Sequence, residues 1–194
     1  MAKIEACRLC PRRCGVTRLP GRDEGPGYCG MGADALVARS ALHFWEEPCI
    51  SGKQGSGTVF FSGCSLQCVF CQNYALSHQG KGKRVSVESL RRMMDALVEQ
   101  GAHNINLVNP THFAAFLAET LTGYRPGVPV VYNSSGYESL EGLGLMAGKV
   151  DVYLPDFKYF DDRWALRYSH APAYFEHAAQ ALEEMVRQTG APQL

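Results

Sequence analysis

Three cysteines stand close together near the middle of the chain. They lie in the run Cys64-Ser-Leu-Gln-Cys68-Val-Phe-Cys71, which has the spacing C-x3-C-x2-C. Three thiolates this near one another can hold one face of a cubane iron–sulfur cluster. Three protein ligands leave one iron open, which favours catalysis over simple electron storage. The alternative is a zinc site with His78 as a distant fourth ligand, although zinc sites more often use paired C-x2-C or Cys/His motifs.

A second group of cysteines lies at the N-terminus. Cys7, Cys10 and Cys14 have the spacing C-x2-C-x3-C, and Cys29 follows as a fourth thiol. Such a set suits a structural zinc ion or a second iron–sulfur cluster, and both interpretations stay open. Residues 1–34 are rich in Cys, Gly, Pro and Arg. We therefore expect a small loop-rich module that needs its metal to fold.

Other residues near these groups have simpler interpretations. Arg12 and Arg13 lie between N-terminal cysteines, where they would support thiolate charge. Cys49 has no near partner and is expected to be a small buried residue. The aromatic run 43–45 is expected in the core or in an interface.

The composition narrows the class of protein. The 194 residues carry 19 basic and 19 acidic side chains, and this zero net charge argues against a nucleic-acid partner. No apolar run is long enough to span a membrane. The first residues lack the apolar core of a signal peptide, so we expect a cytoplasmic protein. Disulfides are rare in that compartment, which leaves metal or redox chemistry for the eight cysteines.

Strand and helix patterns alternate from residue 57 onward. Short β-branched and aromatic runs predict strands, and apolar residues at helical spacing predict helices, with Ser86 as an N-cap. The predicted strands are 58–61, 104–108, 128–132 and 150–154, and the predicted helices are 86–101, 111–121, 139–146 and 174–188. This alternation predicts an α/β fold, a partial (βα) barrel with a parallel sheet, over residues 57–194. Residues 35–56 are assigned to a connecting segment between the Cys-rich N-terminal module and this barrel.

Polar residues follow the predicted strands. Ligands of parallel sheets bind at the carboxyl ends of the strands. Four strand ends carry the residues that we select on chemical grounds: Cys64, Asn109-Pro-Thr-His112, Asn133-Ser-Ser-Gly136 and Asp156-Phe-Lys158. Side chains at Asp156 and Lys158 would point to the same side of an extended strand.

The C-x3-C-x2-C motif with an aromatic residue before the third cysteine resembles the signature of the radical S-adenosylmethionine (SAM) superfamily. Within it, Gly57-Thr-Val-Phe-Phe61-Ser-Gly-Cys64 and Cys71-Gln-Asn73 resemble the pyruvate formate-lyase activating enzymes. The runs Trp45-Glu-Glu-Pro, 101–108 and 153–158 look similar to an uncharacterised iron–sulfur branch of these enzymes. The resemblance covers nearly the whole chain, but it says little about the substrate.

The resemblance implies a 4Fe-4S cluster on Cys64, Cys68 and Cys71, with SAM bound at the open iron. Reductive cleavage of SAM would give a 5′-deoxyadenosyl radical that abstracts hydrogen from a substrate. The cofactor-binding residues that it implies are Phe70, Asn73, Asn109, Thr111, Asn133, Ser135, Asp156 and Lys158. Where relatives often have Gly-Gly-Glu, this chain has Asn109-Pro-Thr-His112, so a neutral group would replace a carboxylate. His112 is either a ligand or simply a residue at a helix start.

The implied partners follow from the same resemblance. A glycyl-radical enzyme would be the protein substrate, and a flavodoxin- or ferredoxin-type protein would donate the electron. The alternative is a non-catalytic iron–sulfur or zinc module for electron transfer or structure. Because the chain has fewer strand–helix units than complete barrels of that superfamily, we expect a barrel truncated at the C-terminus and open on one side.

Overall fold

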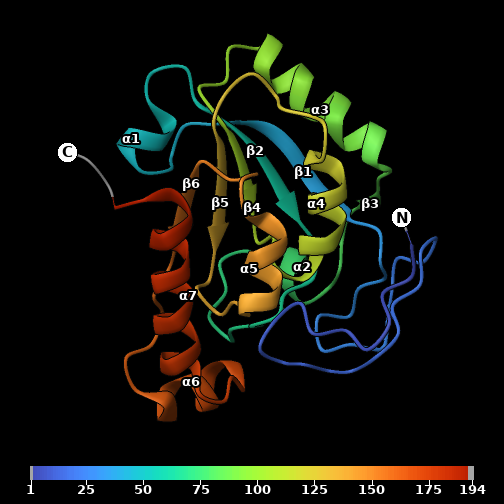
Figure 1. The fold of residues 1–194 in the computed structure, drawn as a ribbon, viewed down its shortest axis with the longest axis vertical. Coiled ribbons are helices and arrows are strands. Elements are labelled where there is room, and N and C mark those ends of the chain that lie inside the picture. The colour runs from blue at the N-terminus through green and yellow to red at the C-terminus, as the bar shows by residue number, and fades with distance from the viewer. Residues whose placement is uncertain (1, 192–194) are drawn as a thin grey trace.

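The computed structural model describes residues 2–191 and contains one six-stranded sheet with the order β3-β1-β2-β4-β5-β6 (Figure 1). Residues 192–194, the last of the predicted barrel range, lie outside the described residues. The strands are β1 (Leu36–His43), β2 (Ser56–Phe61), β3 (Lys83–Arg84), β4 (Ile105–Val108), β5 (Val130–Ser134) and β6 (Val152–Pro155). The helices are α1 (Pro48–Ser51), α2 (Tyr74–Ser77), α3 (Val87–Glu99), the 3-10 helix η1 (Thr111–Phe113), α4 (Ala114–Leu121), α5 (Leu140–Met146), α6 (Asp162–Ser169) and α7 (Tyr174–Thr189).

The strands β2, β4, β5 and β6 are parallel and pair in chain order. The predicted α/β fold, a partial barrel with a parallel sheet, is therefore confirmed. β1 pairs antiparallel with β2, and β3 pairs antiparallel with β1. β1 lies within the segment 35–56 that sequence reasoning assigned to a connection. Its residues are mostly half-buried or exposed, so the hydrophobic signal for a strand is weak there.

One face of the sheet is covered by helices. Figure 1 shows α3, α4, α5 and α7 on the same side of the strands. Leu90, Met94 and Leu97 of α3 are buried against strand residues such as Val59. Ser86 caps this helix as predicted, because its hydroxyl accepts a hydrogen bond from the Ser89 amide at 3.2 Å. The cavity described below is lined by Phe60 of β2, Val108 of β4 and Asn133 of β5, among other residues.

The N-terminal module, residues 2–34 of the described chain, contains only isolated bridges such as Ile4 with Arg18. Arg18 is 1% exposed and donates hydrogen bonds to the carbonyls of Met31, Gly32 and His112. A buried guanidinium is tolerated only when its donors are satisfied in this way. The module is therefore joined to η1 by a buried hydrogen-bonded side chain.

One minor expectation is wrong, and a second is wrong in part. Cys49 is exposed on α1 rather than buried, because this short helix lies at the surface. Phe44 and Trp45, which were expected in the core or in an interface, are exposed, Trp45 to 89%. The core role is therefore wrong, and the interface role stays a prediction. Among residues 2–191, no helix combines the length and apolar character that crossing a membrane requires.

Candidate functional site

The cluster loop, residues 64–71, follows β2 directly. Cys64 and Cys68 are buried and Cys71 is partly exposed. The pKa of the Cys64 thiol is raised to about 11, mainly by burial and also by the neighbouring Cys68 and Cys71, against the opposing effect of hydrogen bonds from backbone amides. One of these, the Leu66 amide, donates to the Cys64 sulfur at 3.3 Å. Amide donors aimed at cysteine sulfur are one means by which proteins tune iron–sulfur clusters.

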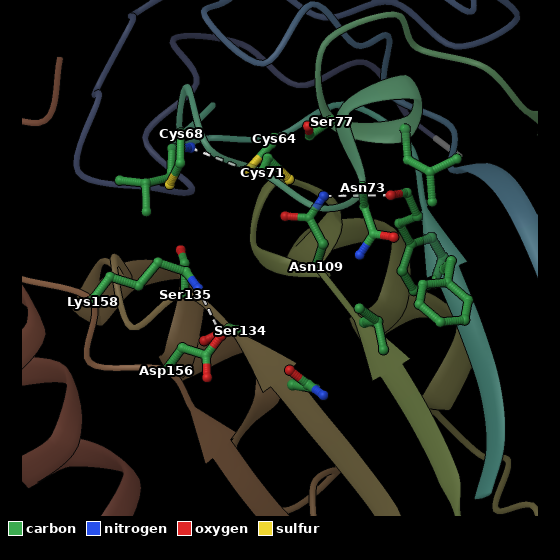
Figure 2. Close-up of a pocket in the computed structure, with 16 residues that line it drawn as sticks. Cys64, Cys68, Cys71, Asn73, Ser77, Asn109, Ser134, Ser135, Asp156 and Lys158 are labelled. Atoms are coloured by element: carbon green, nitrogen blue, oxygen red, sulfur yellow. Dashed lines mark hydrogen bonds and ion pairs between the residues drawn. The ribbon is translucent and has the colours of Figure 1, made fainter. Parts of the chain in front are cut away.

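The three thiols line a cavity at the carboxyl ends of the parallel strands. Its volume is about 610 Å³ and includes space open to solvent. Figure 2 shows the three cysteines on one side of the cavity and residues from the ends of β5 and β6 across from them. The predicted residues that line it are Cys64, Cys68, Cys71, Asn73, Asn109, Asn133, Ser135, Asp156 and Lys158.

Asn109 braces the cavity between the cysteines and β5. Its φ of 60° lies in the left-handed region, which asparagine tolerates better than most residues. Its backbone amide donates to the Asn133 carbonyl at 2.9 Å, and its side-chain amide donates to the Gly63 carbonyl. Asn109 therefore joins the end of β4 to the residue that precedes Cys64.

Asp156 and Lys158 form an ion pair on the far side of the cavity, with 2.7 Å between Oδ2 and Nζ. The Asp156 side chain is 66% exposed. Sequence reasoning missed Tyr174, whose hydroxyl accepts from the Lys158 amide at 2.8 Å and donates to the Ser135 carbonyl at 2.7 Å. Tyr174 thus ties two predicted strand ends together. It begins α7, and nothing in the local pattern distinguishes it from other aromatic core residues.

Two predicted residues do not line the cavity. Thr111 is buried, and its hydroxyl donates to Glu138 at 2.5 Å. Phe70 is 56% exposed and packs edge-on against Tyr159 and Tyr168. In this structure both side chains contact other residues of the protein rather than the cavity.

Buried titratable groups lie behind the site. Glu138 is buried. Burial is the main reason that its pKa is raised to about 7, and hydrogen bonds such as that from Thr111 oppose this increase. His112 donates from Nε2 to the Ser62 carbonyl at 2.7 Å, and burial together with Arg18 lowers its pKa to about 3. His112 is therefore a neutral core residue and does not line the cavity.

Glu46 is a second group that sequence reasoning did not select. One oxygen of its carboxylate accepts hydrogen bonds from Asn106 at 2.9 Å and from Asn133 at 3.1 Å. Burial and the adjacent Glu47 raise its pKa. Because Asn133 lines the cavity, Glu46 lies next to it. Its only sequence signal was its place in the Trp45-Glu-Glu-Pro run.

The donor set of the cluster loop fits an iron–sulfur cluster. Three thiols from one loop line a single cavity, and one sulfur already accepts a backbone amide. Within residues 2–191, no three Cys, His, Asp or Glu side chains stand in a geometry that would already ligate a metal ion. The loop therefore supplies the thiols, and binding of the cluster would draw them into their final arrangement.

The N-terminal cysteines also lie near one another. A Cβ atom on Gly27 would be 3.9 Å from the sulfurs of both Cys14 and Cys29. Burial raises the pKa of Cys10 to about 12, and nearby Cys29, Cys7 and Cys14 contribute to the increase. Arg18 Nη1 lies 3.9 Å from the Cys7 sulfur.

Comparison with known proteins identifies the family. The profile of the Radical SAM superfamily matches residues 58–189, which is most of the chain. The chain is also 32% identical over 178 residues to an uncharacterized protein of Methanocaldococcus jannaschii. This alignment covers 88% of the chain but 50% of the relative, so the chain spans about half the length of the curated relative that it matches. The family match extends from β2 through the cluster loop to α7, and the chain belongs to the radical SAM superfamily.

Proposed function

We propose that the chain cleaves SAM reductively at a 4Fe-4S cluster held by Cys64, Cys68 and Cys71. The observation that carries this proposal is that the three thiols and the polar ends of β4, β5 and β6 line one cavity. Cys64, Cys68 and Cys71 would hold the cluster, which would supply one electron for the cleavage of SAM to methionine and a 5′-deoxyadenosyl radical. The work of the protein is to bind, orient and shield these groups.

The residues around the cavity suit a zwitterionic cofactor. Asp156 offers a carboxylate that is largely exposed, and Lys158 offers an ammonium, so either can exchange part of its ion pair for cofactor contacts. Asn73 and Asn109 offer amide groups beside the cysteines. Ser135 is held in place by the hydrogen bond from Tyr174 to its carbonyl. These residues would bind and position the polar groups of SAM beside the cysteines.

The substrate and partners are the less specific part of the proposal. The activity would be of the pyruvate formate-lyase activating type, with hydrogen abstraction from a glycyl-radical enzyme. A cytoplasmic flavodoxin- or ferredoxin-type protein would donate the electron. Support comes from the resemblance of residues 57–64 and 71–73 to activating enzymes and from the cavity, whose volume includes space open to solvent.

We also propose that Cys7, Cys10, Cys14 and Cys29 bind zinc or a second iron–sulfur cluster. Three of these thiols are buried, although the module contains little regular structure. A triple variant, Cys64→Ala with Cys68→Ala and Cys71→Ala, isolates this site. We expect it to retain either zinc or iron at a constant ratio to protein. Retention of neither metal would contradict the proposal.

The main experiment is anaerobic reconstitution of the protein with iron and sulfide, reduction with dithionite and addition of SAM. We expect 5′-deoxyadenosine and methionine to form in equal amounts, measured by liquid chromatography. The matched control is the triple alanine variant treated in the same way. An intact cluster in the wild-type protein with no cleavage above this control would contradict the proposed function.

A further inference from the structure

We propose that Arg12 of the N-terminal module is a positioning residue for the cluster loop. Its guanidinium donates to the carbonyls of Ser65 at 2.8 Å and Leu66 at 3.4 Å, both inside that loop. It also donates to the carbonyls of Ser169 at 2.7 Å and His170, at the end of α6. One side chain therefore joins three segments that are far apart in the sequence.

These contacts fix the path of the loop between two of its cysteines. A carbonyl held at Ser65 fixes the peptide plane that ends in the Leu66 amide, because the peptide unit is planar. This amide donates to the Cys64 sulfur at 3.3 Å. The next residue, Gln67, has a φ of 51°, and its side chain donates to the Tyr28 carbonyl at 2.9 Å. The N-terminal module thus holds three successive residues of the loop.

Tyr28 completes the arrangement. The centre of the Arg12 guanidinium lies 3.7 Å from the centroid of the Tyr28 ring, which is a close cation–π contact. The Tyr28 hydroxyl donates to the Ser169 carbonyl at 3.3 Å, the same acceptor that Arg12 uses. Stacking limits the orientations of the guanidinium, so its donors stay aimed at the loop.

The same residues contact the N-terminal thiols. Arg12 lies between Cys10 and Cys14 in sequence, and its backbone amide lowers the pKa of Cys10 by hydrogen bonding. The Tyr28 amide donates to the Cys14 sulfur at 3.4 Å. A metal on these thiols would therefore hold Arg12 and Tyr28 in place, so the occupancy of the N-terminal site would influence the cluster loop.

Gly63 provides an independent contact between the two regions. Its φ is 74°, and a Cβ atom there would lie 2.7 Å from the Cys29 carbonyl oxygen and 2.4 Å from Cγ of Met31. Glycine is required by both the backbone angle and the lack of space. The residue immediately before Cys64 therefore packs directly on the N-terminal module.

The test begins with the protein purified anaerobically under reducing conditions, with the metal of the N-terminal site retained and no SAM added, so it does not depend on catalysis. Amide hydrogen exchange is measured across residues 64–71 for the wild-type protein, Arg12→Ala, Arg12→Lys and the control Arg13→Ala. Arg13 is half-exposed and pairs with Glu141 at the surface. We expect exchange in the loop to rise at least about tenfold in Arg12→Ala while exchange in β4 and β5 is unchanged, because only the loop loses its contacts.

The second measurement is iron bound after reconstitution. The proposal rests on the proposed function in taking the loop as the cluster site. We expect about 10-fold weaker iron retention against a chelator in Arg12→Ala, the effect expected of a supporting residue around a metal site. A shifted electron paramagnetic resonance signal of the reduced cluster would accompany it.

The conservative variant separates positioning from general stability. A lysine supplies charge but not the fork of donors or the planar stack, so Arg12→Lys should fold and still fail to protect the loop. If Arg12→Lys restored loop protection and iron retention fully, or if Arg12→Ala changed neither, the proposal would be overturned. Absence of SAM cleavage in a wild-type protein with a protected loop would instead contradict only the proposed function.

Discussion

The two sides of the cavity are built in different ways. On the cysteine side, Cys64 and Cys68 are buried, and Arg12 holds the intervening backbone. On the side of β6, Asp156 and Lys158 form an exposed ion pair, and Phe160 is 85% exposed. In the proposed function, the cysteine side is where three sulfur atoms would bind one cluster. The open side has room for contacts that form only when a cofactor or substrate arrives.

The sheet explains part of this difference. β2, which leads into the cluster loop, has neighbours on both sides in β1 and β4. β6 pairs only with β5 among the described residues. A strand with two neighbours is held by two sets of backbone hydrogen bonds, whereas an edge strand is held by one. Substitutions should therefore have larger effects on the cysteine side than on the β6 side.

The largest effect is expected for Cys71→Ala. Removal of one of three ligands should abolish cluster binding in the loop and reduce 5′-deoxyadenosine formation to background, because two thiolates cannot hold the cubane. Iron analysis and the SAM cleavage assay measure this. The matched control is Cys49→Ala, since Cys49 is exposed and lies outside both cysteine groups. Equal loss of iron in both variants would contradict the assignment.

The next largest effect is the pH dependence of stability that Glu138 causes. Glu138 lies behind the cavity, on neither the cysteine side nor the β6 side. Its pKa is raised from 4.5 to about 7, so the folded state holds its proton more tightly than the unfolded state. Stability should therefore fall as pH rises from about 4.5 to about 7, by about 3 kcal/mol, and the loss should be complete above that range.

Glu138→Gln isolates this contribution. Urea unfolding at several pH values should show that the unfolding free energy of the variant increases relative to that of the wild-type protein as pH rises. His112 titrates in the opposite sense, since its pKa is lowered, but it is present in both proteins and cancels in the difference. A wild-type to variant difference that stays constant with pH would contradict the prediction.

A smaller effect is expected at Asn109, on the cysteine side. Asn109→Ala removes the hydrogen bond to the Gly63 carbonyl and places a less tolerant residue at a φ of 60°. We expect a loss of about 2 kcal/mol in unfolding free energy. Asn109→Gly loses the same hydrogen bond without the backbone cost and should be about 1 kcal/mol more stable than the alanine variant. Equal stability of the two variants would argue against strain at this position.

The smallest effect on stability is expected on the β6 side. Lys158→Ala breaks an exposed ion pair, so the unfolding free energy should change by less than about 1 kcal/mol. Binding of SAM to the reconstituted protein should nevertheless weaken, measured by equilibrium dialysis. Arg163→Ala breaks a similar exposed pair with Asp161 outside the cavity and should leave SAM binding unchanged. A large loss of stability in Lys158→Ala would contradict the contrast between the two sides.

The sequence predicted the parts of the site that depend on local pattern. The three cysteines lie within eight residues, and the polar strand ends follow hydrophobic runs, so periodicity and topology were enough to place them in one cavity. α3 was predicted with its cap at Ser86 for the same reason. In the structure the cysteines and the ends of β4, β5 and β6 line one cavity, and Ser86 caps α3.

The rest depends on contacts that no local pattern encodes. Arg12 was expected to support thiolate charge, but it donates to carbonyls as far away in sequence as His170. Glu46, which follows the C-terminal end of β1, accepts a hydrogen bond from Asn133, which lies 87 residues later in the sequence. Tyr174 joins two strand ends from the start of a helix. β1 was missed because its pairing is antiparallel and its burial is partial.

The buried Arg18 has a consequence for protein engineering. It donates hydrogen bonds to the carbonyls of Met31, Gly32 and His112. These hydrogen bonds connect the Cys-rich segment, which ends at residue 34 in the sequence analysis, to the rest of the chain. A shortened protein that starts at residue 35 would lose this guanidinium and also Met31, which packs in the main core. The Cys-rich segment thus contributes Cys29 and Met31 to the same core as the strands and helices. If this segment were replaced by the corresponding segment of a relative, the barrel residues that contact it would have to be replaced as well.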